Sequence, residues 1–180
     1  MNSLDKQASP RSEDPRSHIR RTDRAIADEN RIAELLHMAQ VGFIATIQDD
    51  QPYLNSNLFW FDEAKNCIYF HTANTGRTRA NIEGNPNVCF GIAEIGDLIP
   101  ADIALEFSVE YAGVIAFGHG RIVDDADEAE YGLYGLIKKY FPELQPGEDY
   151  RMITADELAR TSVFAIDIET WSGKQKMKPV

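Results

Sequence analysis

The chain contains 180 residues, of which 43% are hydrophobic and 10% aromatic, a composition typical of one globular domain and not of a disordered or membrane protein. Its formal net charge is −11, and this acidity argues against nucleic-acid binding, which requires a basic face. No apolar run is long enough to span a bilayer, and the N-terminal residues contain no apolar signal-peptide core, so we expect a cytoplasmic protein without a membrane partner.

The first 24 residues are rich in Ser, Arg, Asp and Pro and show no apolar periodicity. This pattern predicts a flexible N-terminal arm over residues 1–24, ahead of one domain over residues 25–180. An arm of this kind could also lie over a partner subunit. The helical spacing of Ile32, Leu35 and Leu36 then predicts an amphipathic helix over residues 27–40 that covers a sheet.

Strands dominate the remainder of the chain. Runs of β-branched and aromatic residues between turn signals predict six strands, at residues 41–48, 53–61, 67–72, 87–94, 105–123 and 161–169. Their short turns favour an antiparallel meander that closes into a small barrel, with capping helices at residues 77–83 and 124–140 and a helical turn at 157–160. A loop over residues 95–104, a bulge near Gly113 or Gly118, and a tail over residues 170–180 complete the prediction.

Cys67 and Cys89 both fall inside predicted strands. Neither has a Cys-x-x-Cys partner or a nearby pair of histidines, the spacing expected of metal ligands. We therefore expect buried, reduced thiols and no bound metal.

The stretch I-Y-F-H-T-A-N-T-G-R-T-R-A-N, residues 68–81, predicts a strand, a short loop containing Gly76, and a helix that begins near Arg77 and Arg79. Free amide groups and the helix dipole favour an anion at such a helix start, and guanidinium groups add charge there. Without an anion, the dipole disfavours a cation in the first turn. The alternative is that both arginines lie at the surface beside acidic neighbours and bind nothing.

Five strings occur in order along the chain: Q-P-Y from residue 51, Y-F-H-T-A-N-T-G-R from 69, N-P-N-V-C-F from 85, S-V-E-Y-A-G-V-I-A-F-G from 108, and W-S-G-K-Q from 171. In this order they resemble the FMN-binding split-barrel family related to pyridoxamine 5'-phosphate oxidase. Within that family the chain is most similar to the nitroimidazole-resistance (Nim) proteins. The similarity extends over residues 27–176.

The resemblance implies a homodimer of antiparallel split barrels that holds FMN at the subunit interface. It also implies which residues contact the cofactor. These residues are Asn55, Ser56 and Asn57 along the flavin, Phe70, His71 and Thr72 beside it, Gly76, Arg77, Thr78 and Arg79 at the phosphate, and Ser108, Gly113, Trp171 and Lys174 from the partner subunit.

Two positions depart from the family pattern. The family usually follows the phosphate-binding arginine with lysine, whereas this chain has Thr78, with Arg79 one residue on. The tyrosine of the long strand is usually followed by Arg-Ser, whereas here Ala112 and Gly113 follow it. The C-terminal Arg/His motif by which true pyridoxamine phosphate oxidases bind substrate is absent, so we do not expect vitamin B6 chemistry.

The resemblance implies an FMN-dependent oxidoreductase that carries electrons from a reduced donor, such as a nicotinamide, to a small electron-poor substrate such as a nitroaromatic 5-nitroimidazole. His71 is the candidate proton donor, because its pKa lies near working pH. The alternative is a flavin-binding sensor or carrier without turnover, or a module that binds haem or a deazaflavin.

Several of these residues also have a purely structural interpretation. His71 could be a half-buried strand histidine, and Asn55, Ser56 and Asn57 could form a strand edge that faces water. Trp171 could pack on the barrel while Lys174 is solvated.

Overall fold

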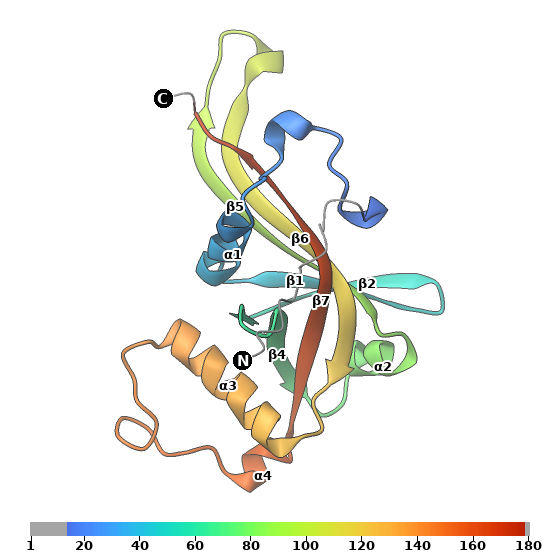
Figure 1. Ribbon diagram of the computed structural model, residues 1–180, viewed down its shortest axis with the longest axis vertical. Helices are drawn as coiled ribbons and strands as arrows, with labels where there is room; N and C mark the ends of the chain where they lie inside the picture. Colours follow the sequence, from blue (N-terminus) through green and yellow to red (C-terminus); the bar gives the residue numbers. More distant parts are fainter. Residues whose placement is uncertain (1–13, 179–180) are drawn as a thin grey trace, which may run out of the picture.

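The computed structural model describes residues 14–178, whose strands form one antiparallel sheet in the order β2-β1-β5-β6-β7-β4-β3 (Figure 1). The strands are β1 (Gly42–Gln48), β2 (Gln51–Asn57), β3 (Trp60–Asp62), β4 (Cys67–Ala73), β5 (Asn87–Ile99), β6 (Ser108–Ile122) and β7 (Thr161–Lys176). The mainly β, antiparallel prediction is confirmed, although the sheet has seven strands and not six.

The extra strand arises where one strand was predicted over residues 53–61. β2 and β3 lie on opposite edges of the sheet, although only Leu58 and Phe59 separate them. The sheet must therefore curl until its edges meet at this point, which gives a split barrel. The Phe59 amide donates to the Tyr140 hydroxyl at 3.0 Å instead of to a neighbouring strand. That hydroxyl also lies 2.8 Å from the carbonyl oxygen of Gln40, to which it donates.

The three longest strands extend further than the sequence indicates. β5 continues through the predicted loop because Leu98 and Ile99 pair with β6 beyond a register shift at residues 95–98. β7 continues through the predicted tail because Trp171 and the residues after it pair with β6. A second register shift lies between Phe117 and Gly118, beside one of the two positions where a bulge was expected in this strand. The extra residue is Glu169, because Phe117 pairs with Thr170 and Gly118 with Ile168, so the bulge lies in β7 and not in β6.

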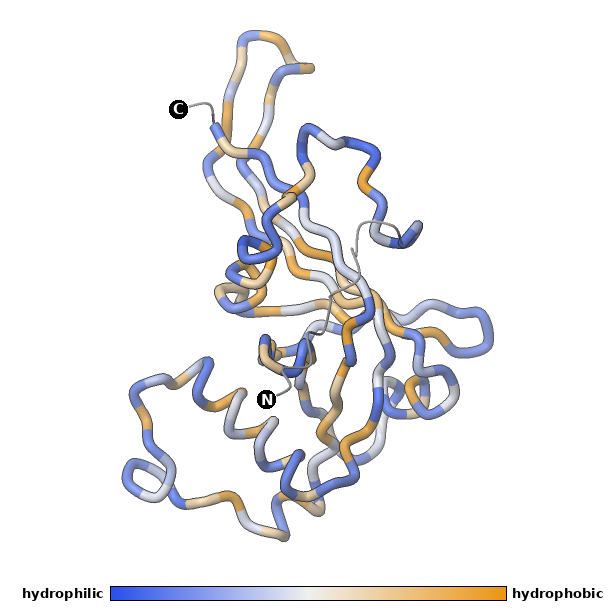
Figure 2. The backbone as a smooth tube through the Cα atoms, in the orientation of Figure 1, coloured by the Kyte–Doolittle hydropathy of each residue, from blue (hydrophilic) through white to orange (hydrophobic). Residues whose placement is uncertain are grey.

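The β5–β6 ribbon projects beyond the barrel at one end of the molecule (Figure 1). Its tip contains a 3₁₀ turn, η4 (Ala104–Glu106). Figure 2 shows hydrophobic residues along this ribbon, and among them Leu98 and Leu105 are 73% and 94% exposed. The ribbon therefore carries apolar surface that its own barrel does not cover.

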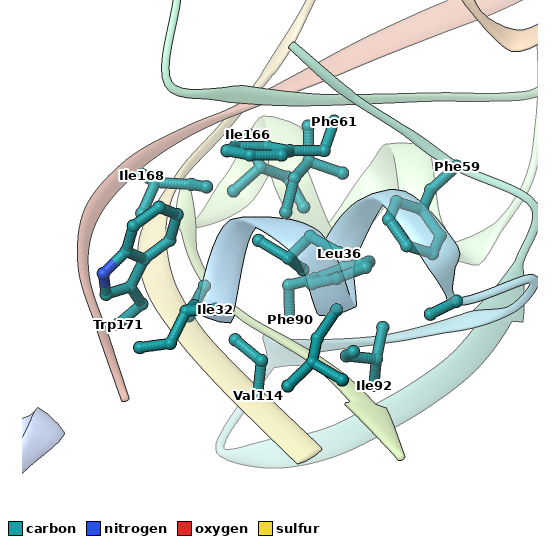
Figure 3. Packing of buried hydrophobic residues seen from close by; sticks show 14 of the residues in the cluster. Ile32, Leu36, Phe59, Phe61, Phe90, Ile92, Val114, Ile166, Ile168 and Trp171 are labelled. Atoms are coloured by element: carbon teal, nitrogen blue, oxygen red, sulfur yellow. The ribbon is translucent and has the colours of Figure 1, made fainter. Parts of the chain in front are cut away.

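Four helices pack around the sheet: α1 (Glu29–Met38), α2 (Arg77–Gly84), α3 (Ala126–Tyr140) and α4 (Ala155–Leu158). The side chains of Asp28 and Asp125 cap α1 and α3 by accepting backbone N–H bonds from the first turn. Ile32 and Leu36 of α1 fill the barrel interior beside Phe90 and Trp171 (Figure 3). No helix among residues 14–178 is both long and apolar enough to cross a bilayer.

α3 covers a second, smaller core on the other face of β4. This core contains Cys67, Tyr69 and Val163, whereas Ile68 and Phe70 belong to the barrel interior. The side chains of β4 thus alternate between the interior and the α3 side, as expected for a strand that is buried on both faces. Cys67 and Cys89 are both free thiols, with Cys67 buried and Cys89 half-buried.

Residues 14–24 lie against their own barrel, and residues 1–13 of the expected arm lie outside the described residues. The segment contains two 3₁₀ turns, η2 (Pro15–Ser17) and η3 (Thr22–Arg24). Arg16 forms an ion pair with Glu169 at 2.9 Å, and the Thr170 hydroxyl donates to the buried Ser17 hydroxyl at 3.0 Å. These contacts fix the segment beside β6 and β7.

Candidate functional site

The turn between β4 and α2 is built to receive an anion. Gly76 has a φ of 149°, which side chains other than glycine rarely adopt, and no atom would lie within 4 Å of a Cβ built there. α2 begins at Arg77 with no side-chain cap and no acidic residue in its first turn, and its first backbone bond runs from Ala80 to Gly76. The amides of the first turn therefore face an open space at the positive end of the helix dipole.

Arg77 and Thr78 lie on the β2 side of this turn. The Arg77 guanidinium carbon is 4.7 Å from the centre of the Tyr53 ring, and Arg77 has no carboxylate within 4 Å among residues 14–178. Thr78 is only 6% exposed, and its hydroxyl oxygen lies 3.5 Å from the side-chain amide nitrogen of Asn55. Tyr53 was not among the predicted site residues, although the Q-P-Y string contains it.

Asn57 supplies a further polar group to this side of the sheet. Its side-chain nitrogen is buried and has no hydrogen-bond partner among the described residues. Asn55 and Asn57 share one face of β2 because side chains alternate along a strand, and Ser56 therefore points to the opposite face. A buried donor without a partner is unfavourable unless a ligand supplies the acceptor. We call this part of the surface, where β2 contacts the start of α2, the anion groove.

Arg79 does not join Arg77 in the anion groove. It donates to Glu83 at 2.8 Å and to the buried Ser162 hydroxyl of β7 at 2.7 Å. Positions 77 and 79 are about 200° apart around a helix of 3.6 residues per turn, so the two guanidinium groups leave the helix on opposite sides. Arg79 therefore cannot replace the lysine that the family usually has at the position of Thr78.

The β4 residues point in different directions. Thr72 pairs with Ser162 on the interior side, and Phe70 is fully buried and stacks on Phe164 with ring centres 4.9 Å apart. The Phe70 ring therefore cannot reach a ligand. His71 pairs with Val163 and lies on the α3 side of the strand, away from the face that carries Phe70 and Thr72.

The ionisation state of His71 follows from its surroundings. Its side chain reaches solvent, yet burial by the neighbouring protein lowers the pKa of the imidazole below its usual value. The ring is therefore mostly neutral at pH 7, and a neutral imidazole is a weaker proton source than an imidazolium ion. The structure does not bring His71 together with Asn55, Arg77 and Thr78.

Trp171 is a core residue. It is 8% exposed, and its ring lies edge-on to Phe61 with centres 5.8 Å apart (Figure 3). This packing agrees with the structural interpretation of Trp171, and its contact with a flavin stays a prediction. Its position in the central strand β7, and not in a tail, explains the burial.

Gly113 and Lys174 lie opposite each other on β6 and β7 and line one cavity of about 430 Å³. The cavity, which we call the outer groove, is bounded on its other side by Arg16, His18 and Ile19 of the N-terminal segment. A Cβ at position 113 would lie 3.0 Å from the Ile92 carbonyl oxygen, so this close approach favours glycine over serine. Ser108 lies at the start of β6, and its hydroxyl accepts a bond from Lys176.

The outer groove opens onto an apolar face of the sheet. Phe43 of β1 pairs with Gly91 of β5, which pairs with Ile115 of β6. Phe43 and Ile115 are 43% and 41% exposed, and Leu54 of β2 is 63% exposed. We call this side of the sheet, turned away from α1, the outer face. A sheet face that meets water normally carries polar side chains, so these exposed residues mark an interaction surface.

A cluster of charged groups on the α3 side stabilises the fold. Arg121 donates to Glu128 at 2.6 Å and to Asp167 at 2.9 Å, and the Tyr69 hydroxyl donates to Glu128 at 2.8 Å. The Arg121 hydrogen bonds lower the pKa of Glu128 to about 2. These bonds attach α3 to β4, β6 and β7.

Fold and site together define a split-barrel protein with an anion groove at the start of a short helix. The model of the pyridoxamine 5'-phosphate oxidase family matches residues 28–175, and the chain belongs to this family. No curated protein sequence matches the chain.

Several solved structures share the fold. The flavocytochrome Anf3 from Azotobacter vinelandii has a TM-score of 0.79 at 20% identity, over 94% of this chain and 78% of that one. An FAD and haem binding protein from Mycobacterium smegmatis has a TM-score of 0.76 at 19% identity, over 86% and 74%. A candidate 5-nitroimidazole antibiotic resistance protein from Bacteroides thetaiotaomicron has a TM-score of 0.71 at 18% identity, over 84% and 86%.

Proposed function

We propose that the protein is a flavin-dependent oxidoreductase that binds FMN in the anion groove and works in the cytoplasm as a homodimer. The observation that carries the proposal is the turn at Gly76 and Arg77. There, an uncapped helix start, a guanidinium group without an acidic partner among the described residues, and open space above glycine occur together. Each of these features favours a phosphate group.

The residues along β2 fit the rest of the cofactor. Asn55 and Asn57 are half-buried and present their side-chain amides on the same face of β2, the face proposed to lie along the flavin. Tyr53 and Arg77 stack at the phosphate end. Flavin binding also agrees with the family and with the flavocytochrome and the FAD and haem binding protein that share its fold. FMN is our choice over FAD because the groove provides one arginine and one helix start, which suit a single phosphate.

A homodimer would complete the site. The outer face carries Phe43, Leu54 and Ile115, which a second copy could bury. Gly113 and Lys174 open onto this same face, so they would meet a cofactor held by the partner copy. The acidic chain offers Lys174 without an ion pair within 4 Å among residues 14–178, so its ammonium group is available to an anion beside the partner's cofactor.

A flavin bound there would supply two-electron transfer from a nicotinamide donor to a small electron-poor acceptor, for which we propose a nitroaromatic such as a 5-nitroimidazole. The protein contributes the groove that binds and orients the ring and the open side that admits the substrate. The hypothesis that His71 delivers a proton is kept as a testable part of this proposal, although its neutral ring points to the α3 side.

Purification and absorbance spectroscopy test the proposal. The purified protein should be yellow, or become yellow with added FMN. Its absorbance should bleach anaerobically with NADPH or NADH and return when a 5-nitroimidazole is added. A colourless protein that takes up neither FMN nor FAD would refute flavin binding.

A flavin sensor or carrier without turnover is the second candidate. It is favoured by the absence of histidine, cysteine and carboxylate side chains among the residues assigned above to the anion groove, which are Tyr53, Asn55, Asn57, Gly76, Arg77 and Thr78. In that case the protein would bind flavin, but neither donor would bleach it. Haem or deazaflavin uptake by the purified protein, measured in the same absorbance titration, would point to another cofactor.

A further inference from the structure

The N-terminal segment supplies one wall of the outer groove. Arg16, His18 and Ile19 line it from the N-terminal segment, whereas the family match begins at residue 28. The segment is fixed to the barrel, because Ser17 is 8% exposed and hydrogen-bonded to Thr170, and Arg16 is ion-paired with Glu169. The groove is therefore a preformed cavity.

The floor of the outer groove suits a flat apolar ring. Ile115 and Phe117 of β6 lie beneath it, Gly113 leaves the strand surface open, and half-buried Ile19 faces them from the wall. A volume of about 430 Å³ falls within the range of small-molecule pockets. A single substituted aromatic ring fits a pocket of this size, with apolar surface on both of its faces.

The charges around the outer groove favour an anionic substituent on that ring. Lys174 has no carboxylate within 4 Å among the described residues, whereas the nearby Lys176 bonds to Ser108 and Lys178 is paired with Asp97 at 2.8 Å. Arg16 is balanced by Asp14 and Glu169. His18 adds a polar ring, and Glu94, which follows the Ala93 that pairs with Gly113, contributes the opposite charge. An ammonium group at the edge of an apolar cavity is a binding group for a carboxylate.

We propose that the outer groove binds a small aromatic carboxylate, with the ring between Ile19 and Ile115 and the carboxylate at Lys174. The role of this ligand as the electron-accepting substrate rests on the proposed function, because Lys174 and Gly113 would lie beside a cofactor of the partner copy. The binding itself does not depend on that function. The N-terminal segment is then the element that selects the substrate.

Calorimetric titration with 4-nitrobenzoate tests this proposal, with nitrobenzene as the neutral probe of the same ring. The unmodified protein should bind 4-nitrobenzoate at least about 10-fold more tightly than nitrobenzene, the factor expected for one charge-assisted hydrogen bond. Lys174→Gln should abolish this preference. Lys178→Gln removes a neighbouring lysine that does not line the outer groove, and it should leave both affinities unchanged.

The wall is tested separately with Ile19→Ala, which should weaken both probes by about 5-fold through the loss of apolar contact. Circular dichroism melting of each variant excludes unfolding as the cause. Equal affinity for the two probes, no effect of Lys174→Gln, or no effect of Ile19→Ala in folded proteins would overturn the proposal. The titration is run on protein with and without added FMN. A protein that binds 4-nitrobenzoate but no flavin would therefore refute the proposed function and not this inference.

Discussion

Replacing Arg77 by alanine should weaken FMN binding, whereas replacing Arg79 by alanine should not. Arg77 has no carboxylate partner among residues 14–178, so no ion pair must break before it binds a phosphate. Its hydrogen bonds to the phosphate would therefore contribute fully to the binding free energy. One such charged bond contributes about 1.5–3 kcal/mol, which corresponds to a loss of about 10- to 150-fold in affinity for Arg77→Ala. Arg79 is already bonded to Glu83 and Ser162, so Arg79→Ala should change the FMN affinity by less than about 3-fold and lower the free energy of unfolding by about 1 kcal/mol.

Flavin fluorescence quenching measures both affinities on protein stripped of cofactor. Riboflavin, which lacks the phosphate, is the matched ligand control, and Arg77→Ala should leave its affinity unchanged. The FMN affinity of the unmodified protein should also fall with added salt more steeply than that of Arg77→Ala. If Arg79→Ala loses more FMN affinity than Arg77→Ala, or if riboflavin is weakened as much as FMN, the assignment of the phosphate site to Arg77 is wrong.

Three further substitutions test other parts of the molecule. Ile115→Glu should place a charge in the middle of the outer face and convert a dimer to a folded monomer by light scattering, and an unchanged mass would exclude this face as the interface. Burial lowers the pKa of Lys139 to about 8, below its value in the unfolded chain, so the unfolded chain binds more protons between about pH 8 and 10.5. As the pH rises through that window, the free energy of unfolding of the unmodified protein should increase by about 1–2 kcal/mol relative to that of Lys139→Met, measured by urea unfolding. A difference that does not change with pH would contradict the lowered pKa of Lys139. His71→Gln tests proton delivery: if the imidazole donates the proton, flavin reoxidation by a 5-nitroimidazole should be about 100-fold slower at unchanged FMN affinity, and a change of less than about 3-fold would exclude this role.

The elements that the sequence predicts well are those with a strong local pattern. The helix around Ile32 and Leu36 and the helix that follows Asp125 both begin at aspartate caps, which are local signals. These features depend on neighbouring residues and not on distant pairing.

The errors concern features that depend on distant partners. Gly96 and Pro100 suggested a loop, yet β5 continues to Ile99 because β6 supplies a ladder partner. The aromatic run around Phe59 read as one strand, although the two halves belong to opposite edges of the sheet. Neither partner is visible in a window of ten residues.

In the candidate site, too, the sequence predicts residues set by local pattern and misses those set by distant contacts. The sequence identifies the glycine and arginine of the turn, and helix geometry alone then separates Arg77 from Arg79. It does not identify Tyr53 or Ile19, because each reaches its place through contacts with segments far along the chain. Burial of Phe70 and Trp171 likewise follows from the barrel and not from their local pattern.

The crossover at Leu58 and Phe59 has a consequence for how this architecture can vary. The chain passes from one margin of the sheet to the other in two residues, and the Tyr140 hydroxyl fastens the backbone there. A connection this short does not tolerate an insertion, because added residues would let the two edges of the sheet separate near Asn57. Insertions are therefore expected in loops such as the ribbon tip at residues 100–107, where extra residues would not disturb the pairing of the barrel strands.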